Sequence, residues 1–195
     1  MIRSLQDLRR YVRADAASRQ TTRLWRSFLI DPVFRFTVYL RFNEYLINIG
    51  LPKLIRLVPL FMFRRLSIRL GFSIPPNVFG PGLAIVHYGL IVVNPAVRVG
   101  ANCRMHAGIN IGGAEGLTTV EKAALRCPTI GKNCYIGPGA KIFGPIKIGD
   151  NCAIAANAVV NKSFGNNKTL GGVPARVISE KGSKGLIHDE AATTN

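Results

Sequence analysis

A small or aliphatic residue recurs at every sixth position through the second half of the chain, and this period constrains the fold more than any other feature. A second apolar or small residue usually follows four positions later. Two inward residues in six describe a short strand and a tight corner, repeated as a stacked parallel β-helix. The repeated positions are Val93, Val99, Met105 and Ile111, then after an interruption Ile130, Ile136, Ile142, Ile148, Ile154 and Val160.

Three such strands make one triangular coil, so residues eighteen positions apart are expected to stack about 4.8 Å above one another. Cys134 and Cys152 have this spacing and are predicted to be small apolar fillers of the prism. The period breaks once, because Ile111 and Ile130 are nineteen positions apart. The segment near 113–126 is therefore predicted to leave the prism as a loop, and binding sites in repeat proteins are often built on such insertions.

Composition favours a folded, reduced chain. Its 195 residues are 48% hydrophobic, which suits a helical part joined to a solenoid and argues against disorder. Three of the four cysteines occupy inward positions, which indicates a cytoplasmic protein without a disulfide framework. The longest apolar stretch, 57–63, is far short of the roughly 20 residues that a spanning helix needs, and charged residues near the start argue against a signal peptide.

Residues 1–72 are predicted to form a basic α-helical cap. They carry 14 Lys and Arg against 4 acidic residues, within a net charge of +16. Asp31 followed by Pro32 is typical of a helix start; that helix is expected to run to about residue 46, and another is expected over 54–70. The predicted organisation is the cap, a β-helix over 73–178 with a loop over 113–127, and a polar tail over 179–195.

Two interpretations of the cap stay open. A basic amphipathic helix containing Phe61, Arg64 and Arg65 suits the surface of an anionic membrane. The same residues also suit packing against the solenoid or a neighbouring subunit, with the arginines in solvent. Nucleic acid is not expected as a partner, because no recognised binding module is present and the basic residues are not interleaved with aromatic side chains.

Two histidines in the coils before the predicted loop are the candidates for chemistry. His87 falls on a repeated position, where an aliphatic residue is expected. Such a histidine is often a hydrogen-bonded packing residue, but the violated period, a nearby glycine and the loop favour a functional role. His106 directly follows a repeated position and is expected to face outward, whereas His188 lies in the polar tail and is given no role.

Five stretches within residues 82–178 carry a resemblance to a known family. They are HYGLIVVNP at 87–95, INIGG at 109–113, PTIG at 128–131, IGPGAKI at 136–142 and GVPAR at 172–176. In this order they resemble the hexapeptide-repeat acyltransferases, specifically the serine acetyltransferase-like branch and its relatives that O-acetylate exopolysaccharide or capsule sugars. Asp31-Pro32 and the helices around it also resemble the cap of serine acetyltransferases, although this cap is shorter.

The resemblance implies a mainly β protein, built as a left-handed β-helix and assembled as a homotrimer with active sites between neighbouring prisms; pairing of trimers stays open. It implies acetyl-CoA as the donor and no metal. His87 matches the general base of the family, a role that suits a near-neutral imidazole, and His106 is the second catalytic candidate. Backbone N–H groups around Gly112 and Gly113 are expected to hold the oxyanion.

The resemblance also implies where the two substrates bind. Acetyl-CoA contacts are expected from Gly139, Ala140, Ala156 and Asn157 beside the pantetheine arm, and from Lys162 and Arg176 near the nucleotide phosphates. Acceptor contacts are expected from Asn94, Arg126 and Cys127. A nucleophilic role for Cys127 is disfavoured, because no flanking base is evident in the sequence.

Departures from the family pattern bear on the acceptor. Serine acetyltransferases place a second histidine where this chain has Cys127, an aspartate where it has Val86, and a further carboxylate near Phe72 or Ser73. The predicted acceptor is therefore a saccharide hydroxyl in exopolysaccharide or capsule biosynthesis, with L-serine as the alternative. A second class of function, a zinc-dependent carbonic anhydrase of the γ type, would need three histidines where the coils offer two. A third class of function is a non-catalytic scaffold.

Overall fold

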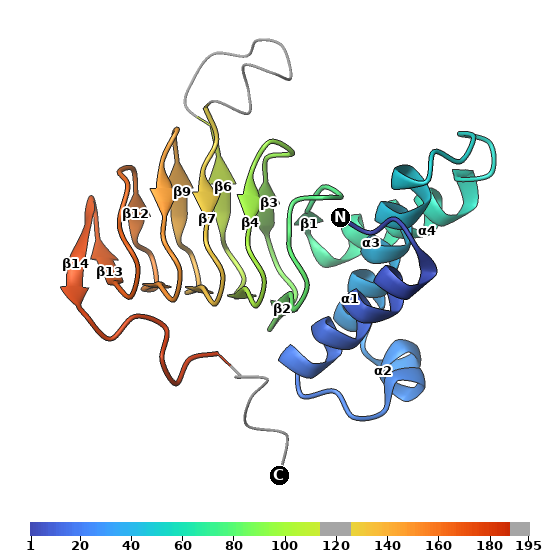
Figure 1. The fold of residues 1–195 in the computed structure, drawn as a ribbon, viewed down its shortest axis with the longest axis horizontal. Helices are drawn as coiled ribbons and strands as arrows, with labels where there is room; N and C mark the ends of the chain where they lie inside the picture. The colour runs from blue at the N-terminus through green and yellow to red at the C-terminus, as the bar shows by residue number, and fades with distance from the viewer. Residues whose placement is uncertain (114–125, 188–195) are drawn as a thin grey trace.

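The computed structural model describes residues 1–113 and 126–187, which form two packed parts (Figure 1). Four helices make up the N-terminal cap, and a three-sided parallel β-helix makes up the remainder. The cap covers the end of the β-helix at which the first coil begins (Figure 1). The helices are α1 (Leu5–Ser18), α2 (Leu24–Ile30), α3 (Pro32–Asn48) and α4 (Leu57–Leu70).

The helix boundaries follow from their capping residues. Asp31 accepts hydrogen bonds from the backbone N–H groups of Val33 (2.9 Å) and Phe34 (3.1 Å), and Pro32 occupies the first helical position. α4 ends at Gly71, whose φ of 75° is the left-handed conformation favoured at helix C-termini. The predicted start of α3 is confirmed, whereas the sequence pattern gives no indication of α2. Within the described ranges, no helix is long and apolar enough to cross a bilayer.

The strands form three parallel sheets, which are the sides of a triangular prism. The chain passes through side A, side B and side C in turn, and the whole is a left-handed parallel β-helix, as predicted. Side A contains β1 (Phe72–Ser73), β3 (Ile91–Val93), β6 (Asn110–Gly112), β9 (Lys141–Phe143) and β12 (Val159–Val160). Side B contains β4 (Arg98–Val99), β7 (Thr129–Ile130) and β10 (Lys147–Ile148). Side C contains β2 (Ala84–Ile85), β5 (Arg104–Met105), β8 (Tyr135–Ile136), β11 (Ala153–Ile154) and β13 (Thr169–Gly172), with β14 (Ala175–Ser179) added antiparallel.

The register of the strands confirms the eighteen-residue coil. Ile136 pairs with Ile154, and Ile142 pairs with Val160. The side chains at these positions are fully buried in the prism. Cysteines 134 and 152 are buried free thiols, as the period predicts, and burial raises the pKa of Cys134 to about 12. Both cysteines therefore act as small apolar residues of the core.

The assignment of His87 to a repeated position of the β-helix is wrong. Ile85 fills that position, because it pairs with Met105, which lies twenty rather than eighteen residues further along the chain. The two additional residues lengthen the corner between β2 and β3, and His87 lies in this corner with its side chain exposed. The longer corner therefore places the imidazole on the surface of the prism instead of in its interior.

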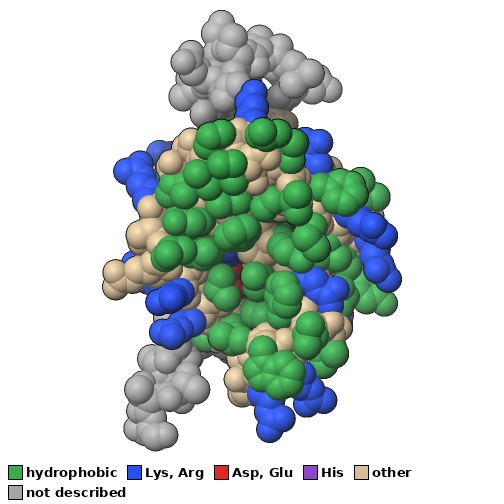
Figure 2. Space-filling view, turned by 90° about the vertical axis from the view of Figure 1, so that its right-hand side faces the viewer, with side chains coloured by type: hydrophobic (Ala, Val, Ile, Leu, Met, Phe, Trp, Pro, Cys, Tyr) green, Lys and Arg blue, Asp and Glu red, His purple; other side chains and the backbone are tan. Residues whose placement is uncertain are grey.

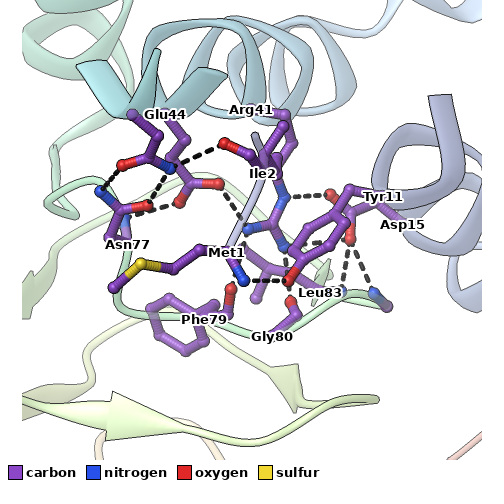
Figure 3. A network of polar contacts seen from close by, with 12 residues as sticks. Met1, Ile2, Tyr11, Asp15, Arg41, Glu44, Asn77, Phe79, Gly80 and Leu83 are labelled. Carbon is purple, nitrogen blue, oxygen red and sulfur yellow. Dashed lines mark hydrogen bonds and ion pairs between the residues drawn. The ribbon is translucent and has the colours of Figure 1, made fainter. Parts of the chain in front are cut away.

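A buried ionic network joins the cap to the first coil (Figure 3). The guanidinium of Arg41 on α3 is fully buried and donates from Nε to Asp15 Oδ2 (2.7 Å) and from Nη1 to Glu44 Oε2 (3.0 Å). It also donates to the backbone carbonyl oxygens of Phe79 (2.9 Å) and Gly80 (2.7 Å). One side chain thus connects α1, α3 and the beginning of the β-helix.

The two acids of this network also bind backbone groups of the first coil. Asp15 Oδ1 accepts hydrogen bonds from the N–H groups of Gly82 and Leu83, both at 2.8 Å. Glu44 Oε1 accepts one from the N–H of Asn77 at 2.8 Å. Burial raises the pKa of Glu44, although the neighbouring guanidinium acts in the opposite direction. Both buried acids therefore have the partners that make burial of a charge tolerable.

Candidate active site

Two histidine rings lie together at the corner between sides C and A. β2 leads into His87 and β5 leads into His106, and the ring centroids are 6.0 Å apart with an interplanar angle of 54°. A backbone hydrogen bond holds the two coils one above the other at this corner, because the N–H of Val86 donates to the carbonyl oxygen of Met105 (3.0 Å). His87 is exposed, and His106 is partly buried on the outside of the prism. The two candidates from the sequence are thus neighbours in successive coils.

Tyr135 on β8 adds a third ring to this corner, which sequence reasoning missed. Its ring centroid is 5.3 Å from that of His106, with the rings edge-on at 62°. The insertion hides this neighbour in the sequence, because Arg104 pairs with Tyr135 although thirty-one rather than eighteen positions separate them. Continuing the coil count across the insertion would have placed the tyrosine beside His106.

The pKa of His106 is lowered from its usual value by burial first, and then by the charge of Arg104 and by His87. The ring is therefore neutral at neutral pH. A histidine whose pKa is depressed on folding stabilises the native state above the unfolded-state pKa of about 6.5, and this contribution is lost as the pH falls through the folded-state value.

We expect the His106 imidazole to titrate below the ordinary histidine range in NMR spectra of the folded protein. Replacing His87 with glutamine should raise the pKa of His106, because one of the groups that lower it is removed. Lys132→Gln, at the corner between sides B and C, should leave the titration unchanged. An unchanged His106 titration in His87→Gln, or a wild-type pKa at or above about 6.5, would contradict this arrangement.

The described coils around the histidines carry no carboxylate. Residues 45–113 and 126–149 contain neither aspartate nor glutamate, and Glu115 and Glu121 between them lie outside the described residues. The charges of these two described segments are all basic. A carboxylate that orients His87 or binds a cationic group of an acceptor therefore has to come from outside these segments.

Three of the residues predicted to bind acetyl-CoA continue the same corner into the C-terminal coils. The N–H of Gly139 donates to the carbonyl oxygen of Ala107 (2.9 Å), and the N–H of Asn157 donates to that of Pro138 (2.9 Å), so successive corners stack. Gly139 has a φ of 73°, and a Cβ there would lie 2.0 Å from Asn157 Oδ1, so the position requires glycine. Ala156 and Asn157 are exposed on this corner.

The other residues predicted to bind acetyl-CoA lie elsewhere. Ala140 is fully buried inside the prism, so its side chain is not available to a ligand and contributes to the core. Lys162 follows β12 and is exposed, with Nζ 5.5 Å from the ring centroid of Phe164. Arg176 is exposed on β14. The two cations are therefore on the surface of the C-terminal coils, where phosphate could reach them.

A second group of predicted residues gathers at the corner between sides A and B. Asn94 follows β3, Gly112 ends β6, and Gly113, Arg126 and Cys127 flank the inserted segment. Most of the predicted loop, 113–127, lies outside the described residues. A Cβ on Gly113 would lie 3.2 Å from Cys127 Sγ, so the two ends of the insertion meet. The residues expected around the oxyanion and the acceptor are thus together, on a different corner from the histidines.

The environment of Cys127 does not suit a nucleophile. The thiol is buried, and burial raises its pKa, although the charge of Arg98 acts in the opposite direction. A nucleophilic cysteine needs the thiolate, which a raised pKa disfavours at neutral pH.

As for metals, no three His, Cys, Asp or Glu side chains in the described part of the chain are grouped so as to hold an ion.

Comparisons with known proteins agree on one family. The family model described as bacterial transferase hexapeptide (six repeats) matches residues 127–162. The serine acetyltransferase of Synechococcus elongatus is 31% identical over 155 residues, which is 79% of this chain and 60% of that protein. A solved serine acetyltransferase from Brucella abortus superposes with a TM-score of 0.66 at 30% identity, covering 90% of this chain and 68% of that one. A second structure of a Brucella abortus serine acetyltransferase, in complex with coenzyme A, gives a TM-score of 0.69 at 29% identity, covering 90% and 67%. This chain thus spans 60% of the length of the Synechococcus relative.

Proposed function

Because this chain belongs to the hexapeptide-repeat acyltransferases, of the serine acetyltransferase type, we propose that it transfers an acetyl group from acetyl-CoA to a hydroxyl group. The observation that carries this proposal is the exposed imidazole of His87 beside His106, on the corner that continues to Gly139 and Asn157. The structural likeness to a serine acetyltransferase in complex with coenzyme A supports this choice of donor.

His87 is the general base of the proposed reaction. It accepts the proton of the acceptor hydroxyl while the hydroxyl oxygen attacks the thioester carbonyl. A C–O bond forms, the C–S bond breaks, and the proton passes from the imidazolium to the departing thiolate, which leaves as free CoA. Because His106 is neutral at neutral pH, it adds no second positive charge beside the imidazolium. Backbone N–H groups around Gly112 and Gly113 hold the charge that develops on the carbonyl oxygen.

The complete site is proposed to form between protomers of a homotrimer. The histidines and the group around Gly113 and Cys127 occupy different corners of one prism, so a single chain does not bring them together. Three prisms packed side by side about a threefold axis would place the histidine corner of one protomer near the second corner of the next. Each trimer would then contain three equivalent sites.

L-Serine is the acceptor that the comparisons favour, because the relatives and structures reported above are all named serine acetyltransferases. This order reverses the sequence interpretation, which placed a saccharide first. A saccharide hydroxyl is the second candidate, and one observation favours it. The ammonium group of serine needs an anionic partner, whereas residues 45–113 and 126–149 carry only basic charges.

Release of free thiol from acetyl-CoA tests the proposal. The protein is assayed with L-serine in one series and with nucleotide-linked or lipid-linked sugars in others. We expect thiol release that depends on L-serine. Release with sugars alone would establish the second candidate, and release that no hydroxyl compound stimulates would overturn acetyl transfer itself.

A further inference from the structure

The outer surface of the cap exposes an unusual amount of apolar side chain. Figure 2 views the molecule from the side of the helices and shows hydrophobic side chains across most of that surface, with Lys and Arg at its edges. We call this surface the cap face and define it by Trp25, Leu29, Leu54, Val58, Phe61 and Ile68, of which Leu54 and Ile68 are 78% and 83% exposed. A contiguous apolar surface of this kind marks an interaction site in a folded protein.

Helix α2 shows most clearly that the cap face is incomplete in the isolated chain. It has seven residues, LWRSFLI, and none of them is buried. A helix of this length is not stable by itself in water and depends on packing of its apolar side chains. Trp25 and Leu29 are nevertheless 72% and 62% exposed. A partner that covers these side chains would therefore stabilise α2.

The basic residues at the cap face have no acidic counterparts on the cap. Residues 1–72 contain 14 Lys and Arg and 4 acids. Two of the acids are buried around Arg41, and the other two pair with Arg10 and Arg19. On α4, Arg64, Arg65 and Arg69 are exposed between the apolar positions. The partner of this face must therefore bring negative charge as well as an apolar interior.

We propose that the cap face docks on an anionic membrane surface. Its apolar side chains would enter the boundary between headgroups and acyl chains, and the arginines of α4 would contact lipid phosphates. A second copy fits poorly, because face-to-face packing would bring arginine against arginine with no carboxylate to separate them. Nucleic acid would match the charge but leave the apolar side chains in water.

Docking in this way places the histidine corner near the lipid. The N–H of Gly89 donates to the carbonyl oxygen of Leu70 (3.0 Å), so the corner that contains His87 is joined directly to the end of α4. In the proposed trimer, a threefold axis parallel to the prisms puts all three caps at the same end, which multiplies the effect of a weak contact. The docking itself does not depend on the acetyl transfer proposed above.

Co-sedimentation of the full chain with vesicles tests the proposal. Vesicles of phosphatidylcholine alone are compared with vesicles that also contain phosphatidylglycerol. We expect binding to the anionic vesicles only, reduced by salt. Arg64→Gln, Arg65→Gln and Arg69→Gln together should weaken binding about 10²-fold. Val58→Ser, Phe61→Ser and Ile68→Ser together should weaken it at least about 10-fold.

Matched variants on the β-helix serve as controls. Lys132→Gln, Lys147→Gln and Lys184→Gln remove the same charge from exposed positions away from the cap, and Val177→Ser with Ile178→Ser removes exposed apolar area. Both should bind as the wild type does. Equal binding of the wild type and the cap variants, or no binding to anionic vesicles, would overturn the proposal. A lower native mass of the triple variant Val58→Ser, Phe61→Ser and Ile68→Ser would also overturn the proposal, because the cap face would then join copies of the chain.

Discussion

Replacing His87 with alanine is expected to lower kcat for acetyl transfer by about 10² to 10⁴, which is the usual contribution of a general base. The imidazole is exposed in the corner between β2 and β3, and Ile85 rather than His87 packs in the prism. Folding should therefore be unaffected, and thermal unfolding should match that of the wild type. Thiol release under saturating acetyl-CoA measures the first effect, and circular dichroism measures the second.

The third histidine provides the control for this experiment. His188→Ala removes the same side chain from the C-terminal tail and should leave kcat unchanged. Turnover at the wild-type rate in His87→Ala would remove this residue from the chemistry. A large loss of thermal stability in that variant would instead assign His87 a structural role, contrary to its exposure.

Replacing Arg41 with methionine is expected to destabilise the fold by about 3–5 kcal/mol. The change leaves Asp15 and Glu44 buried without their cation, and it removes the donors to the carbonyl oxygens of Phe79 and Gly80. The cap should therefore separate from the first coil more readily. Chemical denaturation measured by circular dichroism gives the change in the free energy of unfolding.

The loss of folding stability in Arg41→Met should depend on pH in a defined direction. Burial raises the pKa of Glu44 and the Arg41 guanidinium opposes that rise, so without the guanidinium the native state prefers the protonated form of this acid more strongly. The variant is then relatively most stable below the unfolded-state pKa of about 4 and loses stability as the pH rises. Arg64→Met, at an exposed position, should change stability by less than about 0.5 kcal/mol at any pH. A similarly small change in Arg41→Met would show that the network contributes little.

The six-residue period predicts most of the β-helix, because the residue at each repeated position has to point into the prism. A shift of one residue would turn the isoleucines of β8 or β11 outward, so the register follows directly from the pattern. The period misplaced His87, because the corner between β2 and β3 is two residues longer than the corner between β5 and β6 directly above it. The residues of a corner carry no apolar repeat, so the sequence does not reveal how long a corner is. Here the burial of Ile85 shows the true register.

The cap and the site were less accessible to sequence reasoning. The ion network of Arg41 joins residues that are far apart in the chain, and no local pattern pairs Asp15 with the coil at Gly82 and Leu83. Helix α2 lacks a buried face, so it has no amphipathic signal. The two histidines were found because both lie within the repeat that the sequence shows. Tyr135 was missed because the insertion separates it in the sequence from His106.

The position of coenzyme A in a crystal structure of the complex tests the central proposal most directly. The pantetheine arm is predicted to follow the corner of Gly139 and Asn157, with its thiol within reach of the His87 imidazole. Coenzyme A bound along another corner, or a thiol that no His87 ring of the assembly can approach, would contradict acetyl transfer at this site.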